Sequence, residues 1–441
     1  MKILMILKFE WIHFIRNPFK LIAILLFMLA AAYGINNGSK LYHKQIDEID
    51  RITTQSSEDL ESVIAYYDNN QKGPESRPWV DVTTPFWAIW YASQYSFKEP
   101  SKLMVYGIGQ AEQYGYYKKV TMWSSPYDAD MAEEIANPER LNSGQLDFTF
   151  VILFLMPLLL IICLYNIKGT EYDRGILSLI KIQSGTIKSW VWTRLLFYAL
   201  IIIIVNFILL LIGGTLTDVF SSDMSAFWLY WLWINVYLFI WVIGFGLIIQ
   251  YGQSSVSNTL KMIGLWLLLG FIIPGSVHQW ISTSYPTNLM TDFIDSQRDE
   301  RNELYDLPDE IFQQKLNEQF PDILNSVVIN DSLKIGNARN RSASALANEL
   351  TKASIVPIED SFKAKNKAIS ATYWFNPVTF FQNRFNQTTK THFDDYQIFR
   401  NNIQTRIDRQ VELMVMDIWN DETVDKNRFL NYLEELNGNT K

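Results

Sequence analysis

The residue types that could carry catalytic chemistry are few in this chain and do not cluster. The four histidines stand singly, with no two spaced to share a metal ion: His13, His43, His278 and His392. The one cysteine, Cys163, lies inside an apolar block, which excludes a disulfide within the chain and a cysteine-rich zinc site. We therefore expect no metal centre built from histidine and cysteine ligands.

Motifs for nucleotide binding and nucleophilic catalysis are also missing. The sequence contains no GxxxxGK[S/T] loop to cradle phosphates and no GxSxG turn to present a nucleophilic serine. Its 38 basic and 46 acidic residues give a net charge of −8, which opposes binding to nucleic acid. We expect a protein with no catalytic residues and no cofactor of its own, and therefore not an enzyme.

The most informative polar residues lie in a short loop, residues 167–194. Charged residues and a glycine precede an apolar turn, in the order Glu171, Asp173, Arg174, Gly175 and Leu177. Exposing leucine side chains to water costs roughly 1.5 to 3 kcal/mol each unless something covers them. The pattern predicts a short charged-then-apolar helix that is covered either by the bilayer surface or by a partner protein.

The N-terminal segment, residues 1–17, is a second candidate surface element. At helical spacing Glu10, His13 and Arg16 fall on one side of an otherwise apolar stretch, which is typical of a helix lying in the membrane interface. Asn17-Pro18 then has the form of an N-cap followed by proline in the first turn. A new helix is predicted to begin there.

Five apolar blocks approach the roughly 20 residues needed to cross the hydrocarbon core of a bilayer. They cover residues 18–36, 147–166, 195–214, 226–249 and 261–281. The chain is therefore predicted to be a mainly α-helical membrane protein with five transmembrane helices. In the fifth block, Pro274 is expected to break the helix near its end.

The charge of the connecting segments predicts the orientation. Residues 1–20 and 167–194 each carry a net charge of +3, whereas residues 37–146 and 285–441 each carry −6. Lys and Arg concentrate in short cytoplasmic loops. We therefore expect a multi-pass protein of the cell inner membrane, with a cytoplasmic N-terminus and two large external, or periplasmic, domains.

The second external domain, residues 285–441, is predicted to be mostly helical. Residues 289–320 are helix-prone up to Phe320-Pro321, and apolar residues recur at three-to-five-residue spacing between residues 393 and 417. The first external domain, residues 37–146, begins with a charged helical stretch that continues the first span and then becomes irregular.

Several short motifs resemble those of permease subunits of ABC-2 type transporters. Residues 171–177 (EYDRGIL) are similar to the E-x-E/D-x-G-T-L pattern that follows the second span in that family. Glu10-Trp11 with Arg16-Asn17-Pro18 resembles the family's interfacial helix, and residues 375–377 and 394–400 resemble a bacterial branch with large external domains.

Two features depart from the family pattern. Gln183-Ser184-Gly185 stands where the family has Pro-x-Ser, and the sixth span of many such permeases is not evident in the sequence. Six spans therefore remain the alternative to five.

The resemblance implies a half-transporter. Two permease subunits, identical or different, pair in the bilayer, and two cytoplasmic ABC ATPase subunits bind ATP and magnesium beneath them. It also implies that Glu10, Arg16 and the 171–177 stretch transmit the movement of the ATPase. The aromatic-rich spans suit an amphipathic or envelope-related cargo, and the external domains suit an envelope protein as a further partner.

A membrane-anchored sensor or assembly scaffold with external binding domains is the alternative function. A sensor needs a cytoplasmic output domain, and the predicted inner loops are too short to form one.

Overall fold

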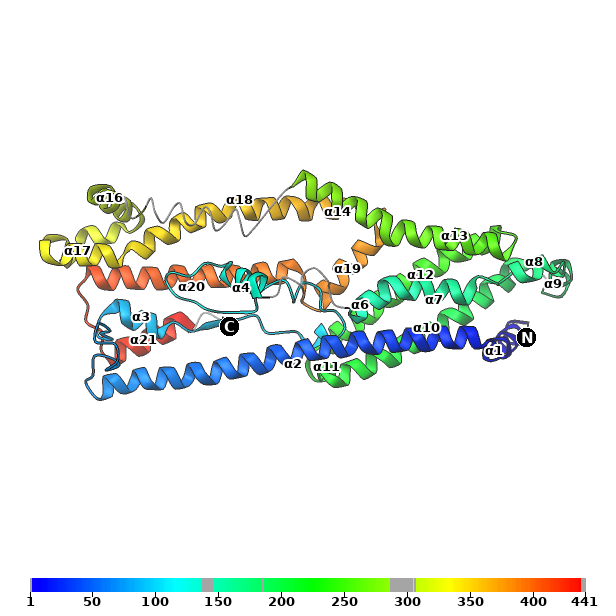
Figure 1. Ribbon diagram of the computed structural model, residues 1–441, viewed down its shortest axis with the longest axis horizontal. Helices are drawn as coiled ribbons and strands as arrows, with labels where there is room; N and C mark the ends of the chain where they lie inside the picture. The colour runs from blue at the N-terminus through cyan, green and yellow to red at the C-terminus, as the bar shows by residue number, and fades with distance from the viewer. Residues whose placement is uncertain (1, 137–145, 185, 286–303, 305–306, 438–441) are drawn as a thin grey trace.

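The computed structural model describes residues 2–136, 146–184, 186–285, 304 and 307–437. The molecule is elongated and mainly helical, with apolar helices bundled in one half and a lobe of long and short helices and two short strands in the other (Figure 1). Within the described residues, five helices are long and apolar enough to cross a membrane. The predicted mainly α-helical, multi-pass membrane protein is confirmed at this level.

Two of the five spans contain a π-helical turn. The first span belongs to α2 (Pro18–Asp68), the third to α10 (Ile187–Leu216) and the fourth to α12 (Met224–Tyr251). The second combines α6 (Phe148–Phe150), the π-helical turn η2 (Val151–Leu155) and α7 (Met156–Leu164). The fifth combines α13 (Ser255–Leu267), the π-helical turn η3 (Leu268–Ile272) and α14 (Ile273–Ser284).

The N-terminal helix α1 (Lys2–Ile15) packs on α10 at the end of the bundle farthest from the lobe (Figure 1). After α1 the chain turns, and the Asn17 side chain caps α2 by accepting a hydrogen bond from the Lys20 amide over 3.3 Å. The predicted helix start at Asn17-Pro18 is confirmed. From there α2 runs without a break for 51 residues, so the first span continues as one helix into the lobe.

Each span buries one face in the bundle and leaves another face uncovered. On α10, Leu195, Ile202 and Leu209 are buried in the bundle core. Leucine and isoleucine side chains at four-residue spacing on the same helix are exposed: Leu200, Ile204, Ile208 and Ile212. Side chains four residues apart share a helix face, so these residues form one continuous exposed apolar stripe along α10.

Two glycines let neighbouring backbone approach α2 closely. A Cβ atom at Gly34 would lie 2.6 Å from the backbone of Asp147 and Phe148, where the second span begins. A Cβ atom at Gly38 would lie 2.4 Å from the Val105 carbonyl oxygen. Any larger residue at either position would push these segments away from α2.

Tyr106 fills the lobe-side end of the bundle. It follows the short 3-10 helix η1 (Lys102–Val105) and is fully buried. Its hydroxyl donates to the Leu210 carbonyl of α10 over 2.6 Å, and its ring stacks on Tyr230 of α12 at a centroid distance of 5.2 Å. A segment between the first two spans is thereby anchored to the third and fourth.

Asp147 caps the second span beside Tyr106. Its carboxylate accepts hydrogen bonds from the Phe150 amide over 2.7 Å and from the Ile108 amide over 3.0 Å. The cap therefore joins the loop after η1 to the first turn of the span.

Burial raises the pKa of the Asp147 carboxyl to about 6, although the amide donors favour the ionised form.

The fifth span does not end at Pro274, which corrects the sequence-based expectation. α14 continues to Ser284, with Pro274 in its first turn immediately after the π-helical turn η3. Proline removes one backbone donor and crowds the preceding turn. A π-helical turn just before the proline accommodates that change, so the helix continues.

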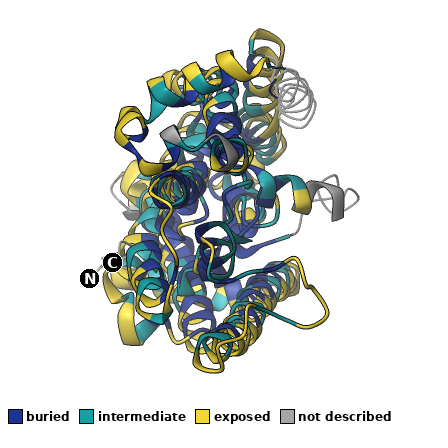
Figure 2. Ribbon diagram, turned by 90° about the vertical axis from the view of Figure 1, so that its left-hand side faces the viewer, coloured by how far each residue is buried: buried dark blue, intermediate teal, exposed yellow. Residues whose placement is uncertain are grey.

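The two long polar segments form one lobe with a shared core rather than two separate domains. Residues from 63–122, including Val82 and Ile89, pack in one buried cluster with residues from 304–436, including Leu316 and Ile403. Seen from the lobe end, buried residues occupy the interior and exposed residues the rim (Figure 2).

The elements of the lobe come from both polar segments. The first segment supplies α3 (Pro85–Ala92), the antiparallel strands β1 (Tyr95–Phe97) and β2 (Tyr117–Lys119), and α4 (Asp128–Ala136). The second supplies α16 (Asp309–Gln319), η4 (Pro321–Asn325), η5 (Val327–Asn330), α17 (Ser332–Arg341), α18 (Ala343–Ala371), α20 (Phe393–Trp419) and α21 (Lys426–Asn437).

Helix predictions for the second polar segment are confirmed where the structure describes them. α20 contains the predicted helix between residues 393 and 417. α16 ends immediately before Phe320-Pro321, as predicted for the 289–320 stretch. Most of that stretch before residue 307 lies outside the described residues.

Candidate functional site

Arg194, on α10, is the centre of a buried ion-pair cluster at the end of the bundle away from the lobe. Its Nε and Nη2 donate to the two carboxylate oxygens of Glu10 on α1, over 2.6 and 3.2 Å. Its Nη1 donates to Glu171 Oε1 over 2.7 Å. The planar guanidinium suits this position because its donors can bind two carboxylates at fixed angles.

Lys20 and Tyr198 extend the network into the spans. The Tyr198 hydroxyl donates to Glu10 Oε1 over 2.7 Å and accepts a hydrogen bond from Lys20 Nζ over 2.8 Å. Lys20 Nζ also donates to the Cys163 carbonyl over 2.7 Å and to Asn166 Oδ1 over 3.3 Å, both in the segment that ends the second span. Every donor of this ammonium group is directed to an acceptor inside the protein.

Glu10, Lys20, Glu171, Arg194 and Tyr198 are called the Arg194 cluster below. Its two cations balance its two carboxylates, and its members come from α1, α2, α10 and α8 (Gly169–Asp173). Removing one partner of a buried ion pair costs about 3 to 5 kcal/mol, because the other charge is left uncompensated. The cluster therefore fixes four helices relative to one another.

The helix α8 is also bonded to the connection between the fourth and fifth spans. Lys168, just before α8, donates through Nζ to the carbonyls of Gln250 and Gly252 over 2.5 and 2.8 Å. Asp173, at the end of α8, accepts from the Ser255 amide and hydroxyl over 3.3 and 3.0 Å and so caps α13. These contacts join α8 to the ends of α12 and α13.

The predicted single helix in the 167–194 loop is two helices in the structure, α8 and α9 (Leu177–Ser184). Gly175 lies between them with a φ of +73°, in the left-handed region. Glycine adopts this conformation without the steric cost that a Cβ atom adds. The helix therefore ends after the charged turn, and a second helix begins at Leu177 instead of one helix continuing.

The structure brings together only part of the residue set predicted from the sequence. Glu10 and Glu171 meet at Arg194, whereas Asp173 binds Ser255. The remaining four lie outside the cluster, with Leu177 half-buried and the others exposed: Arg16, Arg174, Gly175 and Leu177. The predicted site is therefore a buried junction beside an exposed surface, rather than one continuous face.

Exposed apolar side chains surround this junction. On α9, Leu179 is 55% exposed and Ile182 is 81% exposed. On α1, Leu4 and Trp11 are also exposed. Because water does not favour such side chains, this apolar surface fits contact with the bilayer or a partner protein.

Sequence reasoning missed the two cations and the tyrosine of the Arg194 cluster. Arg194 had the appearance of a loop charge beside the third span, and Lys20 that of a flanking charge of the first. A single charged residue within the first two turns of an apolar helix is a detectable signal, since such residues face the protein interior and are paired. The identity of the partners requires the fold.

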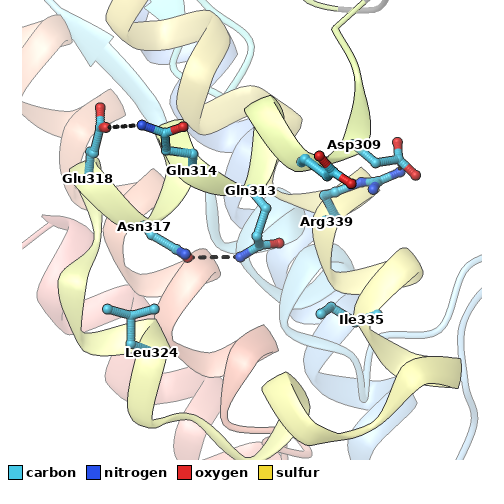
Figure 3. Close-up of a pocket in the computed structure, with 9 residues that line it drawn as sticks. Asp309, Gln313, Gln314, Asn317, Glu318, Leu324, Ile335 and Arg339 are labelled. Carbon is cyan, nitrogen blue, oxygen red and sulfur yellow. Dashed lines mark hydrogen bonds and ion pairs between the residues drawn. The ribbon is translucent and has the colours of Figure 1, made fainter.

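A separate cavity of about 630 Å³ lies in the lobe between α16 and α17 (Figure 3). Its polar side chains bind one another: Gln313 donates to Asn317, and Gln314 donates to Glu318. In the described ranges, no three His, Cys, Asp or Glu residues lie close enough to hold a metal ion. The cavity is far along the molecule from the Arg194 cluster.

Comparison with known proteins identified no relative of this chain. No protein-family model, no curated protein and no solved structure matches the chain.

Proposed function

We propose that this chain is the membrane-spanning permease subunit of an ATP-driven transporter of the ABC-2 type, which works with separate ATPase subunits. The observation that carries this proposal is the junction at Arg194, where the N-terminal helix and the 167–194 loop share one guanidinium of the third span. An ATPase subunit that binds this end of the bundle needs a rigid connection to the spans in order to move them. The junction at Arg194 is suited to be that connection.

The loop is suited to distribute movement. Glu171 connects α8 to α10, while Lys168 and Asp173 connect it to α12 and α13. A push on α9 is therefore passed through α8 to the third, fourth and fifth spans. The exposed Ile182 and Leu179 of α9 are the side chains that we assign to contact with the ATPase.

We also propose how the protein is oriented in the membrane and which subunits it assembles with. The Arg194 cluster faces the cytoplasm and the lobe lies outside the cell, where it contacts an envelope protein. A second permease subunit pairs with this one, and the cargo is amphipathic or envelope-related. A membrane-impermeant thiol reagent applied to intact cells should then label Trp79→Cys, in the lobe, and not Ile182→Cys.

Pull-down with a co-expressed ABC ATPase subunit from the same organism tests the function. Leu179→Asp and Ile182→Asp place a charge in the proposed contact, which should cost about 2 kcal/mol or more and weaken binding more than tenfold. Val327→Asp, at a 67% exposed position of the lobe, is the matched control and should retain the ATPase. ATP hydrolysis should require both proteins.

Two outcomes would overturn the proposal. One is steady ATP hydrolysis by the purified chain alone. The other is recovery of the ATPase at the unmodified level with both α9 variants.

A further inference from the structure

α19 (Pro377–Thr388) packs on the membrane bundle rather than on the lobe core. Val378, Phe381 and Phe385 of α19 are buried in the same core as the spans. Phe381 contacts Tyr237 of α12 at a ring distance of 5.0 Å, and Phe385 contacts Tyr230 at 4.9 Å. In Figure 1, α19 crosses the region between the lobe and the spans, and it contacts η2 of the second span and η3 of the fifth.

These contacts place Phe381, in the first half of α19, deeper in the membrane bundle than the lobe-side ends of the spans. The Tyr237 hydroxyl, beside Phe381, donates to the Leu153 carbonyl over 2.6 Å. Leu153 is five residues after Phe148, where the second span begins. At about 1.5 Å per helical residue, Phe381 therefore lies about 8 Å inside the span.

The turn that precedes α19 lies at the same depth or deeper. Tyr373 contacts Phe380 at a ring distance of 5.5 Å, and its hydroxyl accepts a hydrogen bond from Asn383 Nδ2 over 2.5 Å. These contacts fasten the end of α18 to α19 as a hairpin. Trp374, at the tip of this hairpin, is 85% exposed in the isolated chain.

Several polar groups of the turn are paired within the hairpin, whereas Asn376 Nδ2 is buried without a hydrogen-bond partner. The amides of Phe375 and Asn376 donate to the Thr372 carbonyl, and the Asn376 side chain caps α19 by accepting from the Thr379 amide over 3.4 Å. The Thr372 hydroxyl donates to the Ile369 carbonyl over 2.7 Å. Internal pairing of this kind is what a segment needs where no water is present.

The distribution of charged residues along the sequence agrees with a hairpin that enters the membrane. No charged residue occurs between Lys367 and Arg384, whereas Lys363 and Lys365 precede this stretch and Lys390 follows it. Four helical residues (368–371) and the start of the turn lie between Lys367 and Trp374. In α19, Arg384 lies seven positions after Pro377, which corresponds to about 10 Å along that arm. That length dips into one leaflet of a hydrocarbon core about 30 Å thick and returns, with cations at both ends for the headgroups.

We infer that residues 368–383 form a re-entrant hairpin immersed in the lobe-side leaflet, with Trp374 against lipid acyl chains. The occupant of this exposed aromatic surface is therefore lipid, and neither a second copy of the chain nor another protein. The hairpin anchors the lobe to the bilayer at a point separate from the five spans. The inference depends on the membrane spans and not on the proposed transport function.

Fluorescence quenching by brominated lipids tests the placement. Trp374→Cys and Ala371→Cys, each in a Cys163→Ser background, are labelled with bimane and reconstituted in phosphatidylcholine liposomes with or without bromine on the acyl chains. Ile204→Cys, on the exposed apolar stripe of α10, is the positive control, and Trp79→Cys, exposed in the lobe, is the negative control. Ala371 is exposed beside the turn, so its variant removes no buried contact and supplies an independent position.

We expect acyl-chain bromine to cause a loss of fluorescence at positions 371 and 374 like that at 204, and no loss at 79. Aqueous iodide should quench the label at 79 only. Quenching at 371 and 374 by iodide instead of bromine would place the hairpin in water and overturn the inference. Protection from both quenchers would mean that protein, such as a second copy of the chain, covers the hairpin and would equally overturn the inference.

Discussion

Arg194 and Glu10 are 184 positions apart in the chain, yet Arg194 Nε donates to Glu10 Oε2 over 2.6 Å, with the two side chains 9% and 4% exposed. The N-terminal helix is therefore held to the third span by a fully formed ion pair and not only by apolar packing. Because the same guanidinium also binds Glu171, displacement of either surface element disturbs the attachment of the other.

Replacing Arg194 tests the stabilising role of the cluster. Arg194→Met should lower the free energy of unfolding by about 3 to 5 kcal/mol, because Glu10 and Glu171 lose their shared cation in a buried site. The measurement is thermal or denaturant unfolding of the detergent-purified protein. Arg174→Met, at an exposed position of the same loop, is the control and should change stability by no more than about 0.5 kcal/mol.

The two carboxylates of the cluster should not be equivalent. Within the cluster, Glu10 accepts three hydrogen bonds, two from Arg194 and one from Tyr198, whereas Glu171 accepts one from Arg194. Hydrogen bonds to charged groups contribute about 1.5 to 3 kcal/mol each. Glutamine keeps one acceptor oxygen, so Glu10→Gln should lose two of the three bonds and destabilise by about 3 kcal/mol, whereas Glu171→Gln weakens one bond and should destabilise by about 1.5 kcal/mol. Equal losses in unfolding experiments would contradict the asymmetric arrangement.

The raised pKa of Asp147, about 6, makes stability depend on pH in a defined direction. The folded protein binds this proton more tightly than the unfolded chain, so the stabilisation is present at low pH and is lost as pH rises through about 6. From pH 4 to 7 the unmodified protein should lose up to about 3 kcal/mol relative to Asp147→Asn, which cannot ionise.

Unfolding midpoints of both proteins across this range give the comparison. Asp147→Ala lacks the cap at every pH and so separates loss of the cap from ionisation of the carboxyl. Parallel pH profiles for the unmodified protein and Asp147→Asn would show that ionisation of Asp147 has no effect on folding.

Tyr106 should be the most sensitive residue at the lobe-side end of the bundle. Tyr106→Phe leaves the Leu210 carbonyl without its 2.6 Å donor and should cost about 1 kcal/mol. Tyr106→Ala also leaves a cavity and should cost about 3 to 5 kcal/mol. Tyr33→Phe, at a 58% exposed position of α2, should have no measurable effect on chemical unfolding in detergent.

The spans and several helix ends were predictable because they depend on local composition. Twenty-residue apolar blocks, the Asn17-Pro18 start and the Phe320-Pro321 stop are signals within a few residues of the feature they define. Pro274 was misread, because a proline breaks a helix only if the preceding turn cannot widen, and here it widens into a π-helical turn.

Long-range pairing could not be predicted in the same way. Nothing near Arg194 in the sequence indicates that its partners are Glu10 and Glu171 rather than water at the membrane surface. The shared core of residues 63–122 and 304–436 is similarly invisible, because four spans separate the two segments in the chain. These contacts depend on which ends of the helices the fold brings together.

The unbroken helix α2 begins at Pro18, two residues from Lys20 in the Arg194 cluster, and ends at Asp68 in the lobe. Its 51 residues form a rod about 76 Å long, at 1.5 Å per residue. Such a rod acts as a lever: a tilt of about 5° at its Lys20 end displaces its far end by about 7 Å, given that rise. A rearrangement of a few side chains around Arg194 that tilted α2 by this amount would move the lobe by more than one turn of helix, which is about 5.4 Å.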